Sequence, residues 1–214
     1  MSFNGKIILV RHGETDGNVS GKFHGHFDSD LTARGERQIL LLADRLADFD
    51  ISAIYSSDLK RAFKTAEAAA SKLGLCVNTD ARLREISCGD LEDKTWDEVK
   101  LQYPDIYERW NVLPHTVDMP SGENILDFQK RVSGCVIDIA KSNIGENVLI
   151  ATHGTVIKVL VCFFTNVSMD NFEKVPWVDN TSITVFGTDE RLNFTLELLG
   201  DTRHLEDEAA LEKY

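Results

Sequence analysis

Two short motifs of this 214-residue chain each pair a histidine with a glycine, Arg11-His12-Gly13 and His153-Gly154. Each motif follows a short apolar run, residues 7–10 and 148–151. Imidazole titrates near neutral pH and therefore serves as a base or a nucleophile, while glycine lets a ligand approach the backbone closely. Two such histidines at the ends of two apolar runs predict a catalytic site.

The segments around these motifs alternate between strand and helix patterns. The runs at 7–10, 53–56 and 148–151 are typical of strands buried on both faces of a parallel sheet. The other expected elements are helices at 32–46, 58–73, 121–139 and 155–164, a strand at 76–79, and a hairpin of 182–186 with 193–198. This alternation predicts an α/β fold, a three-layer αβα sandwich with a largely parallel central sheet. Ligands of such sheets bind at the carboxyl ends of the strands.

Particular residues mark the boundaries of these elements. Thr32 is a favoured N-cap for the first helix, and Gly74 a favoured C-cap for the second. Ser121 precedes the apolar pattern of the third helix. The residues between Thr15 and Thr32 form a polar, glycine-rich loop. We expect the acidic tail from Asp201 to be a solvated helix or a frayed end.

Composition limits the classes of partner. The chain has 35 acidic against 23 basic residues, a net charge of -12, which argues against nucleic acid as the main partner. No apolar run approaches the roughly 20 residues that span a bilayer, so we expect no membrane anchor. The four cysteines are far apart and form no metal-binding cluster, which favours a reduced, cytoplasmic location.

The length suits one domain over residues 1–214. Residues 82–122 hold three of the four prolines and show no strong period. We interpret them as an insertion that covers the active site. The aromatic residues Trp96, Tyr103, Tyr107 and Trp110 of this insertion either cover the site or form a local core.

Further motifs follow the first histidine in a regular order. They are Arg11-His12-Gly13-Glu14-Thr15 with Asn18, Asp28, Asp30-Leu31-Thr32, Gly35, Ser56-Ser57-Asp58-Leu59 with Arg61, Thr65-Ala66, Leu83-Arg84-Glu85, Gly89, Ser121-Gly122-Glu123 and Thr152-His153-Gly154. In order and spacing this series resembles branch 1 of the histidine phosphatase superfamily, the phosphoglycerate mutase-like phosphatases. The resemblance covers about the first three-quarters of the chain and implies the phosphoglycerate mutase-like fold.

The resemblance also implies a reaction. His12 would be the nucleophile that forms a phosphohistidine, and Arg11, Arg61 and His153 would hold the phosphoryl oxygens. Glu85 would donate a proton to the leaving alkoxide and later activate water. The chain would then be a metal-independent histidine acid phosphatase-type phosphomonoesterase.

Asn18 and Gly154 would be further contacts to the substrate. The resemblance implies neither a cofactor nor a metal ion. We expect a small phosphorylated metabolite as substrate, because the acidic surface offers no attraction to large polyanions. The hairpin at the end of the chain is a candidate contact for a homodimer.

The residue types support this phosphoryl-transfer chemistry independently of the family resemblance. Charge spreads over three phosphoryl oxygens in the transition state, and the guanidinium forks of Arg11 and Arg61 match that geometry. Neighbouring positive charge should also keep the nucleophilic imidazole neutral.

Several residues allow other interpretations. Arg61 could form a surface charge pair, and Asp90 or Glu92 could replace Glu85 as the acid. His24 and His26 could suggest a metal pair, but no third ligand follows, so we expect them to be solvated and to line the cleft rim.

Two other phosphoryl enzymes and a binding protein are the competing functions. Residues 28–32, Asp-Ser-Asp-Leu-Thr, resemble the signature of magnesium-dependent haloacid-dehalogenase-type phosphatases, but no buried strand precedes them. Phosphoglycerate mutases of the same superfamily carry a longer insertion with a Glu-Arg-His-Tyr-Gly motif, which is absent after Glu85. A non-catalytic binder of phosphorylated ligands would typically have lost one of the catalytic residues. Hydrolysis is therefore the favoured function.

Overall fold

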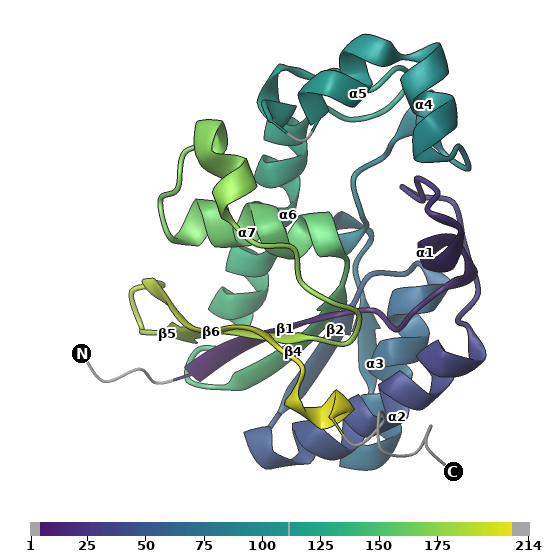
Figure 1. The fold of residues 1–214 in the computed structure, drawn as a ribbon. Helices are drawn as coiled ribbons and strands as arrows, with labels where there is room; N and C mark the ends of the chain where they lie inside the picture. The colour runs from purple at the N-terminus through teal and green to yellow at the C-terminus, as the bar shows by residue number, and fades with distance from the viewer. Residues whose placement is uncertain (1–4, 111, 207–214) are drawn as a thin grey trace.

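A six-stranded sheet forms the centre of the molecule (Figure 1). The computed structural model describes residues 5–110 and 112–206. The strands, in the spatial order β3-β2-β4-β1-β5-β6, are β3 Val77–Thr79, β2 Ala53–Ser56, β4 Asn147–Thr152, β1 Gly5–Arg11, β5 Ile183–Thr188 and β6 Phe194–Asp201. Strands β1 to β4 are parallel, whereas β5 is antiparallel to both β1 and β6. The expected largely parallel sheet is confirmed.

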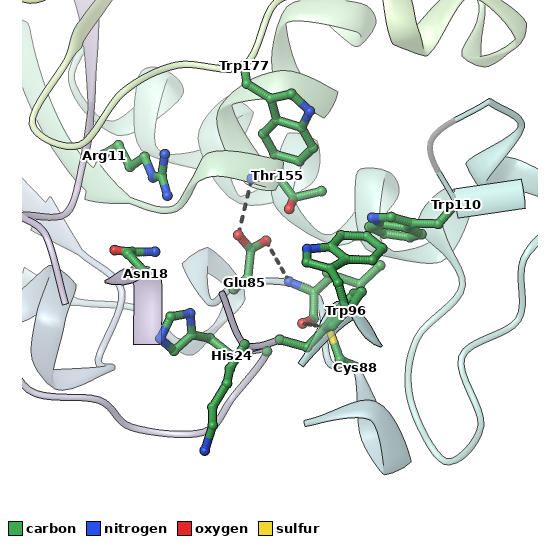
Figure 2. A pocket seen from close by; sticks show the side chains of 13 residues that line it. Arg11, Asn18, His24, Glu85, Cys88, Trp96, Trp110, Thr155 and Trp177 are labelled. Atoms are coloured by element: carbon green, nitrogen blue, oxygen red, sulfur yellow. Dashed lines mark hydrogen bonds between the residues drawn. The ribbon is translucent and has the colours of Figure 1, made fainter. Parts of the chain in front are cut away.

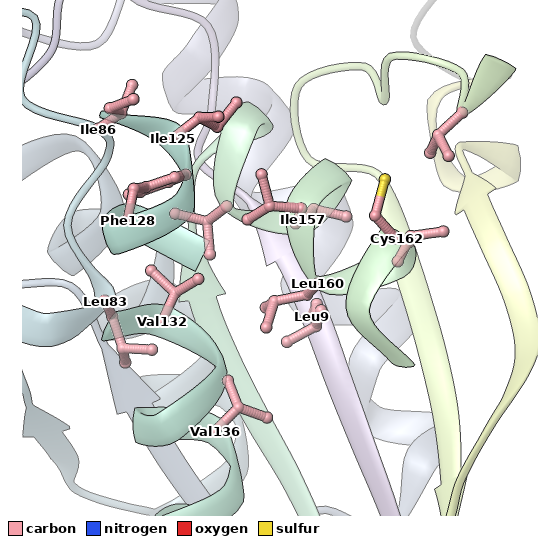
Figure 3. Close-up of a cluster of buried hydrophobic side chains, with 14 of the residues drawn as sticks. Leu9, Leu83, Ile86, Ile125, Phe128, Val132, Val136, Ile157, Leu160 and Cys162 are labelled. Carbon is pink, nitrogen blue, oxygen red and sulfur yellow. The ribbon is translucent and has the colours of Figure 1, made fainter. Parts of the chain in front are cut away.

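Helices cover both faces of the sheet. The pair α2 (Ala33–Leu46) and α3 (Lys60–Leu73) lies on one face, and the pair α6 (Ile125–Ser142) and α7 (Gly154–Phe164) on the other. Alternate residues of β1 face opposite layers: Ile8 packs in the core with α2 and α3, and Leu9 in the core with α6 and α7 (Figure 3). Because strand side chains alternate, a wholly apolar strand is buried on both sides, and the αβα sandwich is confirmed.

Two helix ends follow the expected caps. The Thr32 hydroxyl accepts a hydrogen bond from the Gly35 N–H at 2.9 Å and begins α2. Gly74 ends α3 with a left-handed φ of 69°. The first residues of two helices differ from the prediction. Helix α3 begins at Lys60, whose N–H donates to the Asp28 carboxylate, and α6 begins at Ile125, where Asn124 and not Ser121 is the N-cap.

Three short helices were not expected from the sequence. Helix α1 (Asp16–Ser20) lies in the polar loop, and α4 (Trp96–Gln102) and α5 (Pro104–Trp110) lie in the 82–122 segment, outside the three layers (Figure 1). Each has five or seven residues, too few to show a clear 3.6-residue period. Single turns of 3₁₀ helix occupy Ala47–Phe49, Ala81–Leu83, Gly89–Leu91, Pro114–Thr116 and Arg203–Leu205, and a longer 3₁₀ segment occupies Met169–Lys174.

Three expectations from composition concern the described residues. No helix within 5–110 or 112–206 is both long and apolar enough to cross a bilayer. All four cysteines are free thiols. Most of the acidic tail, beyond residue 206, lies outside the described part of the chain. Strand β6 is an outer strand of the sheet, and its use in a homodimer stays a prediction.

Candidate functional site

The carboxyl ends of three neighbouring strands bring the predicted residues together. Strands β2, β4 and β1 are adjacent, and Arg11 of β1 is in register with Thr152 of β4. His12 and His153 therefore leave the sheet side by side, with ring centroids 5.3 Å apart. The His12 N–H donates to the Thr152 carbonyl at 2.9 Å, which ties the two strand ends together.

His12 is buried and its tautomer is determined. Its side chain is 4 % exposed, and Nδ1 lies 2.7 Å from the Gly13 carbonyl oxygen. A carbonyl oxygen only accepts, so Nδ1 carries the proton and Nε2 keeps its lone pair. Burial lowers the pKa of His12 well below its ordinary value, and the charges of Arg61 and Arg11 lower it further. The imidazole is thus neutral and nucleophilic at neutral pH.

Arg61 is an internal residue. Its side chain is 1 % exposed, and its two Nη atoms donate to the carbonyls of Phe27 and Gly25, each at 2.9 Å. The alternative of a surface charge pair is therefore wrong. Asp58 instead pairs with Arg84, through two hydrogen bonds to the guanidinium.

Three buried nitrogen atoms near His12 have no hydrogen-bond partner within the described residues. They are Nε of Arg11, Nε of Arg61 and Nδ1 of His153. His153 is 0 % exposed, its Nε2 lies 2.9 Å from the Ser57 hydroxyl, and burial lowers its pKa well below the ordinary value. Buried polar groups without partners are unfavourable and rare. Their gathering around a neutral imidazole indicates a site built for an oxygen-rich ligand.

Glu85 is held at the same end of the sheet. Its two carboxylate oxygens accept hydrogen bonds from the N–H groups of Ile86 at 2.9 Å and Thr155 at 3.1 Å (Figure 2). The Thr155 N–H belongs to the first turn of α7, where N–H groups lack partners within the helix. His26 and Arg131 both donate to the Glu85 carbonyl, so its backbone is fixed as well.

A cavity of about 380 Å³ opens beside Glu85. Figure 2 shows Arg11, Asn18 and His24 on one side of the carboxylate and the indoles of Trp96 and Trp110 on the other. The residues that line the cavity come from separate segments of the chain: Arg11, Asn18, Lys22, Phe23, His24, Gly25, Glu85, Ile86, Cys88, Trp96, Trp110, Thr155 and Trp177. His12, His153 and Arg61 are buried and are not among the lining residues.

The two loop histidines and the two alternative acids differ in their relation to the cavity. His24 lines the cavity, as expected of a rim residue, and burial together with the charges of Arg61 and Arg11 lowers its pKa to about 4. His26 does not line it. No group of three or more His, Cys, Asp and Glu side chains suited to a metal ion occurs in the described ranges. Asp90 and Glu92 do not line the cavity either. The Glu92 carboxylate accepts hydrogen bonds from the backbone N–H groups of His26 and Cys88.

The magnesium-phosphatase signature has a structural role at two of its positions. Asp28 accepts the Lys60 N–H at 3.1 Å at the start of α3, and Thr32 caps α2. Two aromatic residues of the 82–122 segment, Trp96 and Trp110, line the cavity, and Trp96 also packs against Phe23 with ring centroids 4.3 Å apart.

Sequence reasoning missed several residues of this site. Trp177 and Thr155 line the cavity, and Asn180 contacts both His12 and Asn18. Trp177 and Asn180 lie in an irregular segment between α7 and β5, for which no period or motif predicts a position. Thr155 could have been found, because it directly follows the His153-Gly154 motif and lies in the first turn of α7.

The sequence and the structure of this chain are similar to those of known proteins in one family. Residues 7–202 match the histidine phosphatase superfamily, branch 1. "Phosphoglycerate mutase-like protein 4" of Arabidopsis thaliana is 36% identical over 210 residues, which are 97% of this chain and 90% of that protein. "Phosphoserine phosphatase 1" of Hydrogenobacter thermophilus is 34% identical over 193 residues, 90% of this chain and 91% of that protein. The solved structure of Bacillus stearothermophilus YhfR superposes with a TM-score of 0.90 at 35% identity, covering 94% of this chain and 99% of that one. With these matches and the αβα fold, the chain belongs to branch 1 of the histidine phosphatase superfamily.

Proposed function

We propose that this chain hydrolyses phosphomonoesters of small metabolites through a phosphohistidine on His12. One observation carries the proposal: a buried, neutral imidazole with a defined Nε2 lone pair lies among buried nitrogen atoms that have no partner in the described part of the chain. The phosphoryl group supplies the missing acceptors. The guanidinium groups of Arg11 and Arg61 and the ring of His153 hold its oxygens, and Asn18 and the backbone at Gly154 complete the contacts.

The first step transfers the phosphoryl group to the enzyme. Nε2 of His12 attacks phosphorus, the bond between phosphorus and the ester oxygen breaks, and the acid form of Glu85 protonates the leaving alkoxide. Fixed guanidinium groups stabilise the charge that spreads over the phosphoryl oxygens in the transition state.

The second step reverses the proton transfer. The Glu85 carboxylate takes a proton from water, the water oxygen attacks phosphorus, and the bond from phosphorus to Nε2 breaks. Inorganic phosphate leaves and His12 regains its lone pair. Activity needs no metal ion, because the arginines supply the positive charge and His12 supplies the nucleophile.

The chain acts as one domain over residues 1–214, with the 82–122 segment covering the site. Trp96 and Trp110, which line the cavity, support this arrangement. Hydrolysis is favoured over phosphoryl transfer between metabolites because the mutase motif is absent after Glu85. One relative is named as a phosphoserine phosphatase, which agrees with a small phosphorylated substrate, although another is named as mutase-like.

A trapping experiment tests the nucleophile. Wild-type protein is mixed with a panel of phosphorylated metabolites and with p-nitrophenyl phosphate, and a quenched sample is searched by mass spectrometry for phosphate on His12. His12→Ala should abolish both the adduct and phosphate release, whereas His115→Ala, which alters a histidine paired with Asp170 outside the cavity, should preserve both. Phosphate release that survives in the His12 variant would refute the mechanism. Conversion of 3-phosphoglycerate to an isomer without release of phosphate would instead favour the mutase.

A further inference from the structure

Residues 178–182, directly before β5, form hydrogen bonds with Arg11 at the end of β1 and with His12, which follows it. The Val178 carbonyl accepts a hydrogen bond from Nη1 of Arg11 at 2.7 Å. The Thr181 N–H donates to the carbonyls of Arg11 and His12 at 3.0 and 3.3 Å, and the Arg11 N–H donates to the Ser182 carbonyl at 3.4 Å. This 178–182 segment thus holds the backbone of the nucleophile and of its neighbouring arginine.

The backbone of the segment is constrained at its centre. Thr181 is fully buried and has a φ of 58°, in the left-handed region that β-branched residues rarely adopt. Such a conformation persists only where the surrounding contacts determine it, and it often accompanies a functional site. Here it directs the N–H of Thr181 and the side chain of the preceding residue, Asn180, toward the end of β1.

Asn180 connects His12 to Asn18. Its Nδ2 donates to the His12 carbonyl at 2.9 Å and to Oδ1 of Asn18 at 3.1 Å. Because a carbonyl oxygen only accepts, the atom of Asn180 that faces His12 must be the amide nitrogen. The orientation of the Asn180 side chain is therefore determined by the backbone.

The orientation of Asn18 is determined in the same way. Its Oδ1 accepts hydrogen bonds from the N–H of Thr15 at 3.2 Å, from the Thr15 hydroxyl at 3.0 Å and from Asn180. A backbone N–H only donates, so the atom that faces Thr15 is the oxygen. Among the described residues the Nδ2 of Asn18 has no hydrogen-bond partner, and Asn18 lines the cavity beside Arg11.

We infer that Asn180 is a positioning residue that turns the amide nitrogen of Asn18 toward the phosphoryl group. This inference rests on the proposed function, because it assigns the free N–H groups of Asn18 to a phosphoryl oxygen. Asn180 does not line the cavity and acts through its neighbour. Without it, Oδ1 keeps only its two donors from Thr15, so the Asn18 amide is held less firmly and its nitrogen is directed at the anion for less of the time.

A double-mutant cycle tests this route. Asn18→Ala and Asn180→Ala should each lower kcat/KM by about 10- to 100-fold, which is the loss expected when one hydrogen bond to a charged group is removed. The double variant should be no worse than Asn18→Ala, because Asn180 then has no amide to orient. If the two losses multiply, Asn180 acts by another route and the inference is wrong. It is equally wrong if Asn180→Ala keeps full activity.

Two further measurements separate positioning from structure and from catalysis. Asn180→Asp keeps the shape but replaces the donor with an acceptor, so it should lower activity as strongly as the alanine variant. Asn193→Ala, which alters an asparagine bonded to Asp189 in the β5–β6 hairpin, is the matched control and should behave as wild type.

Binding of orthovanadate or inorganic phosphate is measured by calorimetry in the same variants. Loss of structure alone would reduce the amount of active protein and leave the Kd unchanged, whereas loss of positioning raises the Kd about 10-fold or more. If wild type binds these anions but hydrolyses no substrate, the proposed function fails. The Kd values of wild type and the variants for the anion then decide by themselves whether Asn180 positions Asn18.

Discussion

Replacement of Arg61 tests whether an internal guanidinium holds both a loop and the phosphoryl group. Arg61→Lys retains one positive charge on a flexible stem but removes the planar fork. A guanidinium has five N–H groups. In Arg61 two of them donate to the carbonyls of Gly25 and Phe27, and Nε has no partner within the described residues. Three N–H groups therefore remain for a phosphoryl group.

The expected loss follows from these hydrogen bonds. A lysine ammonium cannot reach both loop carbonyls and also donate twice to the phosphoryl oxygens. Losing two hydrogen bonds to a charged group costs about 3 to 6 kcal/mol in the transition state, at about 1.5 to 3 kcal/mol for each bond. This corresponds to a fall in kcat/KM of roughly 10²- to 10⁴-fold.

The assay is steady-state hydrolysis of p-nitrophenyl phosphate, with the inhibition constant of inorganic phosphate as a second readout and circular dichroism as a check of folding. Arg84→Lys is the matched control, since Arg84 is partly exposed and pairs with Asp58. Exposed ion pairs contribute little, so its kcat/KM should stay within about twofold of wild type. If Arg61→Lys stays within about fivefold of wild type, the guanidinium does not hold the phosphoryl group with two bonds.

Three other perturbations have definite expected outcomes. Glu85→Gln should strongly lower kcat/KM for alkyl phosphates and lower it much less for p-nitrophenyl phosphate, because nitrophenolate leaves without protonation. Equal losses in kcat/KM, which covers only the steps up to release of the alcohol, would contradict the role of Glu85 as an acid. Burial lowers the pKa of His153 well below its ordinary value, so the unfolded chain binds a proton there below pH about 6.5 and the folded chain does not. The free energy of unfolding should therefore fall as the pH falls from about 6.5 to 5, by about 1.4 kcal/mol per pH unit for this imidazole. In urea unfolding His153→Gln should show a shallower pH dependence than wild type, and an unchanged slope would show that His153 protonates normally in the folded state. Activity should persist after dialysis against EDTA and should not rise when magnesium is added; loss that magnesium restores would refute a metal-independent mechanism.

The fold was predictable because its information is local. Apolar runs such as 7–10 and 148–151 are long enough to show that both faces of a strand are buried, and Thr32 and Gly74 mark helix ends through the hydrogen bonds and the φ that those positions require. The short helices α1, α4 and α5 carry too few residues for a period and were missed.

The site was predictable only in part. The sequence indicated His12 and His153, since each follows a strand in a recognisable motif, and the resemblance to a family indicated Arg61 and Glu85. The sequence could not show that Arg61 is buried, because a charged residue on a helix is normally solvated and only the carbonyls of a distant loop replace that solvent.

Tertiary structure alone decided the protonation and orientation of the catalytic groups. The neutral state of His12 depends on burial and on the charge of Arg61, and the Asn18 amide contacts the distant Asn180, whereas the tautomer of His12 is set by the carbonyl of its chain neighbour Gly13. Sequence thus determined which residue types stand at the strand ends. Burial and hydrogen bonding, which act through space and not along the chain, decided the chemical state in which those residues meet a substrate.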